Sequence, residues 1–379
     1  MVGLKLFEPM TLRGSVLKNR IVVSPMCQYM AKDGYVQAWH QAHHSRFALG
    51  GAGTVLVEAT AVQRDGRITH GCTGLWEDGQ IGGMKAIADL HRSHGVAPGI
   101  QIGHAGRRAS AALPWEGAKP LVLVESDKAW QTVGPSAIAE REGYPVPREL
   151  TAAEIDGIVE AFTAAARRAL AAGFEIIEIH GAHGYLLHSF FSPISNRRSD
   201  AYGGTRDKRM RVPLMAAEVV REVWPSEKPV FYRASVVDGV EGGTTIDDTV
   251  ALARELRSRG IDVIDCSSGG MAGSGSLSTN KIRPGFQVPL AEAVRKGADI
   301  ATMAVGAILD GRQAEAILQG GKADLIAVAR EMLDDPNWAY HAAVSLSMNN
   351  PWSILPRQYG FYLERRAGVL ERGPISPSN

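Results

Sequence analysis

A closed (β/α)₈ barrel is the fold class that this sequence of 379 residues predicts. The main observation is a repeated unit in which an amphipathic helix, a glycine and a short apolar strand follow one another. These strands are almost continuously apolar, which is typical of a parallel sheet covered by helices. An open doubly wound sheet is the alternative, but "SPMCQYM" after the first strand lacks the glycines of a dinucleotide-binding turn.

The repeat is clearest over residues 151–180. "TAAE" is a capping box with Thr151 as N-cap, and apolar residues then recur at helical spacing as far as Gly173. "FEIIEIH" follows as a strand. With "RIVVSPM" as the opening strand, the sequence predicts eight strands, at residues 20–25, 54–59, 97–102, 174–180, 229–234, 261–267, 299–304 and 324–329.

The rest of the chain is expected to extend this barrel, so that residues 1–379 form one domain. "LFEPMTLRGSVLKN" is expected to plug the amino end of the barrel. Residues 105–150 and 184–207 are too long to be simple connections and leave the carboxyl face, where barrel enzymes place their active sites. We therefore expect both to be functional. Residues from about 345 to 379 form a C-terminal extension that we expect at a subunit interface.

Composition and charge exclude several classes of protein. A net charge of +1 and the absence of a basic run give no reason to expect nucleic acid or an anionic membrane as a partner. Three scattered cysteines disfavour a disulfide framework. No stretch reaches the roughly 18 apolar residues of a membrane span. We expect a soluble, cytoplasmic protein.

Polar side chains gather at the predicted carboxyl ends of the strands. The set is rich in hydrogen-bond donors and poor in carboxylates, so it suits an electron-rich, partly anionic ligand better than a divalent metal. Its main members are Cys27, Tyr29, Glu58, Gln101, His104, His180, His183, Tyr185, Arg233, Ser267 and Arg330.

His180, His183 and Tyr185 directly follow a buried strand, and their spacing allows several interpretations. The two histidines suit zinc if His104 or Cys27 supplies a third ligand. Two N–H donors that converge on one oxygen would instead polarise a carbonyl or nitro group. Tyr185 would then be placed to supply a proton. In the simplest alternative, one histidine binds a ligand and the other packs in the core.

A second His-x-x-His pair, His40 and His43, shows that the spacing alone is not specific. It lies in a predicted helix that begins near Val36. Because this pair precedes a strand instead of ending one, we expect it to be structural.

Cys27, Arg233 and Arg330 each allow a structural and a functional interpretation. Cys27 activated by a base would be a nucleophile, which keeps a cysteine hydrolase among the alternatives. Arg233 either faces an anionic edge of a ligand or pairs with Glu58 or Asp238. Arg330 matches a phosphate unless it forms an ion pair at the surface.

Six segments resemble the old yellow enzyme family of FMN-dependent ene-reductases: "SPMCQYM", "VEATAV", "QIGHAGRRAS", "HGAHGYLLHSFFSPISNRRSDAYGG", "YRAS" and "ADLIAVAREML". The resemblance runs from "LFEPMTL" to "DDPNWAYHAA" and is most specific at residues 178–204. Cys27 and the short loops make the chain similar to the branch that includes the xenobiotic reductases and the thermophilic-like members.

The resemblance implies noncovalent FMN on the carboxyl face, with NADPH or NADH as the reductant of activated alkenes such as enones and nitro compounds. It implies that His180 and His183 bind the activating oxygen and that Tyr185 donates the proton. Cys27 would tune the flavin, and Tyr29 would line the substrate pocket. The implied FMN-binding residues are Ser24, Pro25, Met26, Cys27, Ala59, Gln101, Arg233, Gly306, Ala329 and Arg330.

The resemblance also implies a homodimer or homotetramer in which a C-terminal residue reaches the neighbouring active site. Arg357, Tyr359 and Tyr362 are the candidates. The chain departs from the family where Ala329 replaces a glycine, which predicts a more crowded phosphate site. It also departs at Val305, where the xenobiotic reductases have a tryptophan, which predicts a roomier pocket.

Two other functions stay open at this point. A metal- or cysteine-dependent hydrolase on the same barrel is suggested by His-x-x-His and Cys27. A catalytically silent flavin-binding or assembly protein is suggested by the aromatic C-terminal extension. No separate nicotinamide-binding fingerprint is present, so the sequence does not choose between NADPH and NADH.

Overall fold

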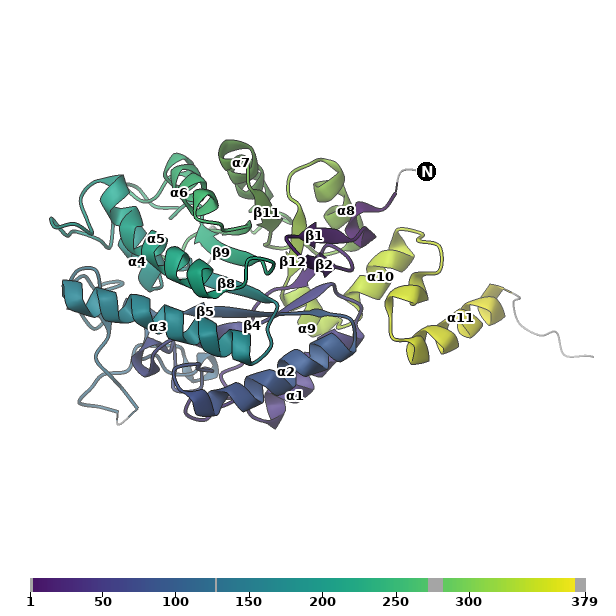
Figure 1. Ribbon diagram of the computed structural model, residues 1–379, viewed down its shortest axis with the longest axis horizontal. Helices are drawn as coiled ribbons and strands as arrows, with labels where there is room; N and C mark the ends of the chain where they lie inside the picture. The colour runs from purple at the N-terminus through teal and green to yellow at the C-terminus, as the bar shows by residue number, and fades with distance from the viewer. Residues whose placement is uncertain (1–2, 127, 272–281, 372–379) are drawn as a thin grey trace, which may run out of the picture.

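Eight parallel strands close into a barrel at the centre of the molecule (Figure 1). The computed structural model describes residues 3–126, 128–271 and 282–371. The strands follow chain order around the barrel, and the last pairs with the first. They are β3 (Ile21–Val23), β4 (Thr54–Ala61), β5 (Ala97–Gly103), β8 (Ile176–Gly181), β9 (Val230–Ser235), β10 (Val263–Ser267), β11 (Ala301–Ala304) and β12 (Leu325–Val328). The eight expected strands and the closed arrangement are confirmed.

Helices cover the outer face of the barrel (Figure 1). They follow the strands in the expected alternation along the chain. The helices are α1 (Ala38–Leu49), α2 (Ile81–Ser93), α3 (Ala152–Ala171), α4 (Leu186–Phe191), α5 (Arg206–Val223), α6 (Ile246–Ser258), α7 (Val288–Ala298), α8 (Gly311–Gln319), α9 (Arg330–Asp334), α10 (Trp338–Ser345) and α11 (Arg357–Glu371). Among the described residues, no helix is both long and apolar enough to cross a membrane.

Helix α3 shows how the sequence sets the helix boundaries. The Thr151 side chain accepts a hydrogen bond from the Glu154 N–H, and Glu154 Oε2 accepts one from the Thr151 N–H at 2.9 Å. The predicted capping box is therefore confirmed. At the other end, Gly173 has φ +88°, a conformation that favours glycine and ends the helix. The buried face between these ends includes Ile155, Ile158, Val159 and Phe162.

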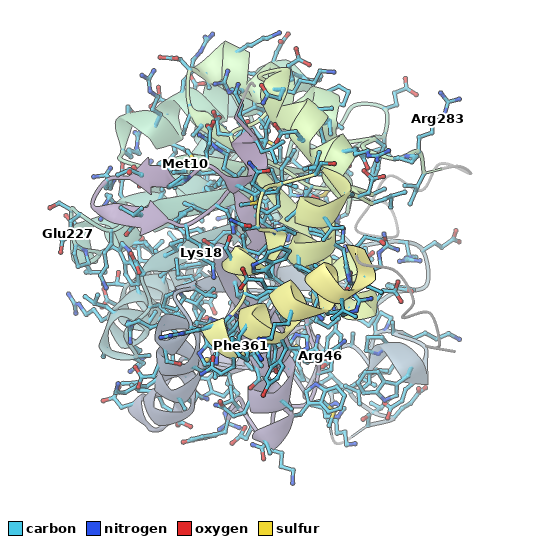
Figure 2. All side chains as sticks on the ribbon, turned by 90° about the vertical axis from the view of Figure 1, so that its right-hand side faces the viewer. Met10, Lys18, Arg46, Glu227, Arg283 and Phe361 are labelled. Atoms are coloured by element: carbon cyan, nitrogen blue, oxygen red, sulfur yellow. The ribbon has the colours of Figure 1, made fainter. Side chains whose placement is uncertain are left out.

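An N-terminal hairpin closes one end of the barrel, as expected. It consists of β1 (Met10–Leu12) and β2 (Ser15–Leu17), and Figure 2 labels Met10 on it. Leu12 and Leu17 belong to the same buried cluster as Ile176 and Val263, the first residues of β8 and β10. The hairpin therefore plugs the amino end and leaves the carboxyl end open to ligands.

The two long excursions hold only short elements. Residues 105–150 contain the strands β6 (Val133–Gly134) and β7 (Arg148–Glu149) and two 3₁₀ turns, whereas residues 184–207 contain α4. After α10, the 3₁₀ turn η6 (Pro351–Ile354) leads to α11, which lies at the edge of the molecule beyond α10 (Figure 1). Figure 2 looks onto this side, where Phe361 of α11 is labelled and exposed.

Candidate active site

A cavity of about 490 Å³ opens at the carboxyl ends of the barrel strands. Its volume is in the usual range for a small-molecule site. The closed barrel brings to its wall side chains that lie far apart in the chain. The lining residues that the sequence had singled out are Ser24, Pro25, Cys27, Ala59, Gln101, His180, His183, Tyr185, Arg233, Ser267, Val305, Gly306, Ala329 and Arg330.

His180 at the end of β8 and His183 and Tyr185 just after it all lie on this wall. The ring centroids of His180 and His183 are 5.1 Å apart, and those of His180 and Tyr185 are 4.8 Å apart. His183 has φ +59°, a left-handed conformation that is uncommon for residues other than glycine. The three rings are therefore grouped by an unusual turn and not by a regular helix.

Contacts on both sides hold His183 in this conformation. Its N–H donates to Ser235 Oγ at 2.9 Å, and its carbonyl oxygen accepts from Arg108 Nη1. The facing backbone is so close that a Cβ at Gly270 would lie 2.3 Å from the carbonyl carbon of His183. A strained turn that its surroundings fix in this way is typical of a functional site.

A buried pair, His188 and Asp238, supports the turn from behind. His188 Nδ1 accepts from the Gly184 N–H at 2.9 Å, and His188 Nε2 lies 2.8 Å from Asp238 Oδ1. Asp238 also accepts from Ser192 Oγ and the Thr244 N–H. Burial alone would raise the pKa of Asp238, but His188 and these two donors lower it on balance. Sequence reasoning missed this support, for which the only signal is a third histidine, His188, in the segment.

The two cavity histidines are neutral near pH 7. Burial lowers the pKa of both rings well below the usual value, and the nearby Arg233 guanidinium lowers it further. His180 Nδ1 accepts from the Ala182 N–H at 3.3 Å, so the neutral ring carries its hydrogen on Nε2. His183 Nε2 lies 2.6 Å from Ser267 Oγ. Neutral imidazoles held in this way offer N–H donors to a ligand oxygen.

Tyr185 keeps its proton at the same pH. Burial raises the pKa of its phenol well above the usual value, although the Arg108 guanidinium, 5.7 Å from the ring centroid, opposes the rise. A neutral phenol on the wall of a cavity is a proton donor for a bound substrate.

Cys27 lies in the cavity wall as a thiol and not as a thiolate. Burial raises its pKa well above the usual value, and the negative charge of Glu58 raises it further. Hydrogen bonds with Ala59 and Tyr29 oppose this rise only in part. Because nucleophilic attack requires the thiolate, this setting disfavours a cysteine hydrolase.

Gln101 and Arg233 reach the cavity from within the barrel. Gln101 Nε2 donates to Glu178 Oε1 at 2.7 Å. Arg233 Nε lies 3.0 Å from Asp265 Oδ2 in an ion pair, and within the described residues this atom has no partner that meets the geometry of a hydrogen bond. Both residues therefore present polar groups to the cavity while buried carboxyl groups hold them from behind.

The partner of Arg233 differs from both partners that the sequence suggested. Asp265 takes this place because it lies opposite Arg233 in the β9–β10 ladder. Glu58 instead turns toward α1, where its Oε1 lies 3.4 Å from His40 Nε2. Asp238 pairs with a histidine, as described above.

Gly306 and Arg330 line the cavity after β11 and β12. Gly306 has φ +107°, and a Cβ there would lie 2.5 Å from Gln287 Nε2, so this turn requires glycine. Arg330 is exposed and has no ion-pair partner within the described residues. A guanidinium without a partner, next to a backbone turn, suits a phosphate group.

The segment before α7 was not expected to contribute to the site. Ile282, Phe286 and Gln287 nevertheless line the cavity. Gln287 Oε1 accepts from Ser268 Oγ at 2.5 Å, and its Nε2 donates to the Val305 carbonyl at 3.0 Å. No motif marks this segment, and only its place after β10 indicates a loop on the carboxyl face.

Comparison with known proteins decides the family. Residues 5–349 match the NADH:flavin oxidoreductase / NADH oxidase family. The chain is 45% identical over 343 residues to the NADPH dehydrogenase of Geobacillus sp. (strain WCH70). The aligned region covers 90% of this chain and 94% of that protein. It belongs to this family, which is the old yellow enzyme family. As a member, it is an NAD(P)H:flavin oxidoreductase.

Other similar proteins support the assignment of this chain to the old yellow enzyme family. The NADPH dehydrogenase of Bacillus subtilis (strain 168) is 42% identical over 357 residues, covering 94% of this chain and 98% of that protein. The structure of morphinone reductase matches with a TM-score of 0.75 at 27% identity, over 90% of this chain and 89% of that chain. The old yellow enzyme homologue from Zymomonas mobilis, with a TM-score of 0.71 at 24% identity, shows the same fold.

Met26 and Tyr29, which the family resemblance implied, are not among the residues that line the cavity, although Tyr29 hydrogen-bonds with Cys27 on its wall. Met26 packs against the hydrophobic core, and the Tyr29 ring meets Trp115 edge-on with centroids 6.1 Å apart. Arg357, Tyr359 and Tyr362 lie on α11 and do not line the cavity of their own chain.

The remaining histidine pair has the structural setting expected for it. His40 and His43 are buried on α1, and His40 Nδ1 accepts from the Gln37 N–H at 2.9 Å. Over the described part of the chain, no three His, Cys, Asp or Glu side chains gather in a group that could hold a metal ion.

Proposed function

We propose that this oxidoreductase is an FMN-dependent ene-reductase that uses NADPH or NADH to reduce α,β-unsaturated carbonyl or nitro compounds. The observation that carries the proposal is the grouping of two neutral imidazoles and a neutral phenol on one cavity wall. Gln101 and Arg233 line the same cavity. The names of the similar proteins, NADPH dehydrogenase and morphinone reductase, support a reductase of this kind.

The residues of the cavity fit FMN. Arg233 lines the cavity while Asp265 Oδ2 lies 3.0 Å from its Nε on the other side, so its guanidinium suits an electron-rich edge of a ligand. Gln101 presents a second polar group, and Arg330 offers a phosphate a guanidinium that has no ion-pair partner among the residues that the structure describes. The residues that would hold FMN, all of which except Met26 line the cavity, are Ser24, Pro25, Met26, Cys27, Ala59, Gln101, Arg233, Gly306, Ala329 and Arg330.

The chemistry that FMN supplies when bound is hydride transfer from NAD(P)H to the β-carbon of an activated alkene. His180 and His183 would donate N–H groups to the carbonyl or nitro oxygen and so stabilise the negative charge that develops there. Tyr185 would donate its phenolic proton to the α-carbon. All three groups are in the required protonation state at neutral pH. Cys27 would contact the cofactor as a neutral thiol.

We also propose that the enzyme is a homodimer or homotetramer in the cytoplasm. Tyr362 and Tyr359 on α11 are 70% and 46% exposed, which suits contact with another subunit. Arg357 at the start of the same helix is a further candidate for a residue that reaches a neighbouring active site.

Steady-state turnover of the purified protein tests the proposal. The protein should be yellow, or become so when FMN is added, and should oxidise NADPH faster when 2-cyclohexenone is present. A colourless protein that stays without flavin after FMN is added would contradict FMN dependence. A flavoprotein that NADPH does not reduce would support a silent flavin-binding protein instead.

A further inference from the structure

Four polar side chains from neighbouring strands meet inside the barrel next to the cavity. They are Gln101 on β5, Glu178 on β8, Arg233 on β9 and Asp265 on β10, and we call them the interior quartet. Gln101 and Arg233 line the cavity, whereas Glu178 and Asp265 do not. Both carboxyl groups are fully buried. The quartet is thus a charged layer that reaches a ligand only through its amide and its guanidinium.

The contacts within the quartet leave one carboxyl group without a cation. Asp265 pairs with Arg233 at 3.0 Å, and Glu178 Oε1 accepts only from the neutral Gln101 amide at 2.7 Å. Glu178 Oε2 has no hydrogen-bond partner in the described structure. Glu58 is turned away toward α1, so it does not join the layer.

Two buried carboxyl groups near a single guanidinium, which pairs with Asp265 alone, cannot both ionise without cost. Burial raises the pKa of Glu178 to about 8, and the negative charge of Asp265 also raises it, whereas Arg233 and Gln101 oppose the rise. Burial likewise raises the pKa of Asp265, against the effect of Arg233. His180, the next inward residue on β8, is neutral and adds no charge to the layer. Glu178 is therefore the member that changes charge in the neutral to alkaline range.

We propose that Glu178 is a positioning residue that takes up a proton from solvent when the bound flavin is reduced, so that the reduction potential gains an extra dependence on pH. This inference rests on the proposed binding of FMN. Reduction places an electron pair, and with it negative charge, on the cofactor beside Arg233. That charge competes for the guanidinium and favours the neutral form of Glu178. One O–H bond forms at a Glu178 carboxyl oxygen with a proton from solvent, and the electron pair comes from the reductant.

The direction of the effect follows from the protonation states. Below about pH 8, Glu178 already carries its proton before reduction and takes up none. Above this pH it is ionised in the oxidised enzyme and binds a proton on reduction, so the potential falls more steeply with pH. Each extra proton changes the equilibrium constant tenfold per pH unit, which is about 30 mV for a two-electron couple.

The test is the midpoint potential of the FMN-loaded holoenzyme from about pH 6 to pH 10, measured with redox mediators. Wild type should show a segment above about pH 8 that is steeper by up to about 30 mV per pH unit. Glu178→Gln should lack this segment, and Glu178→Asp, which keeps an acid, should regain it. Glu292→Gln is the matched control, since Glu292 forms a partly exposed ion pair with Lys296 on α7 and should follow wild type.

The results of these potential measurements support or overturn the proposed role of Glu178. Parallel curves for wild type and Glu178→Gln would overturn it while leaving FMN binding intact. If Glu178→Gln does not retain FMN, the wild-type curve decides alone, because a curve without a steeper alkaline segment overturns the inference. Failure of wild type to bind FMN would instead contradict the proposed function.

Discussion

At the scale of single residues, the proposed chemistry depends on side chains that stay neutral while buried. Tyr185, His180 and His183 line the cavity in their neutral forms at pH 7, because burial disfavours the charged form of each. Removing one of them should therefore affect one step and leave others intact.

Tyr185→Phe removes the phenolic proton and keeps the ring. We expect alkene reduction by the reduced enzyme to slow by about 100-fold or more, which is the usual contribution of a general acid. Flavin reduction by NADPH should be unchanged. Stopped-flow measurement of the two half-reactions checks this, and equal slowing of both would show that Tyr185 is not the proton donor.

His180→Ala removes the N–H donor on Nε2. Phenols such as p-hydroxybenzaldehyde should bind about tenfold more weakly or worse, because a hydrogen bond to a charged oxygen contributes about 1.5–3 kcal/mol. Titration of the long-wavelength absorbance of the phenol complex gives the affinity. An affinity equal to that of wild type would exclude His180 from the oxyanion site.

The sequence predicted the cavity residues at the strand ends, but it did not predict the buried residues that contact and position them. His180, Gln101 and Arg233 could be predicted because each is a polar donor near the carboxyl end of an apolar strand, and the carboxyl face of a barrel collects such positions. Asp265 and Glu178 could not, since a carboxyl group in the middle of a strand says nothing of its partner across the ladder. Phe286 has no motif at all and reaches the cavity only through the path of a loop.

At the scale of elements, helices α1 and α2 pack through buried histidines. The His44 and His91 ring centroids are 5.0 Å apart, and neither nitrogen of His91 has a hydrogen-bond partner in the described structure. Burial lowers the pKa of His91 to about 3. The histidine rings between α1 and α2 are therefore stable in this interface only in their neutral form.

We expect acid to destabilise the protein through this interface. The unfolded chain binds a proton at His91 below about pH 6.5, whereas the folded chain does not do so until about pH 3. The stability that depends on the neutral ring is thus present above pH 6.5 and is lost as the pH falls. At pH 5.5 the loss is about 1.4 kcal/mol for this one histidine.

His91→Phe keeps an aromatic ring at this position and removes the imidazole group that binds a proton in acid. The difference in unfolding free energy between pH 7.5 and pH 5.5 should shrink by about 1.4 kcal/mol in this variant. Urea unfolding followed by circular dichroism measures it. The same pH dependence in both proteins would show that His91 is not buried as a neutral ring.

At the scale of the whole molecule, the barrel is closed by the N-terminal hairpin. Leu17 of β2 is fully buried, whereas Val16 beside it is 62% exposed. Leu17→Ala should lower the unfolding free energy by about 2–5 kcal/mol, because it leaves a cavity at the amino end. Val16→Ala is the matched control and should change it by less than about 0.5 kcal/mol. Equal effects in denaturant unfolding would contradict the plug.

The barrel itself could be predicted because its signals are periodic and repeated. The helix, glycine and strand unit recurs along the chain, and a cap such as Thr151 marks where a helix begins. The geometry of the loops could not be predicted, since the left-handed turn at His183 depends on Ser235, Arg108 and Gly270 from other parts of the fold. The register of β9 against β10, which selects Asp265 for Arg233, is likewise a property of the assembled barrel.

The central claim is that the carboxyl end of this barrel holds FMN between the interior quartet and the Tyr185 wall. A crystal structure of the FMN-loaded protein soaked with p-hydroxybenzaldehyde tests it most directly. We expect the flavin ring against Gln101 and Arg233, its phosphate near Arg330, and the phenol oxygen within hydrogen-bonding distance of His180 and His183. A flavin bound elsewhere, or a phenol oxygen turned away from both histidines, would contradict the claim.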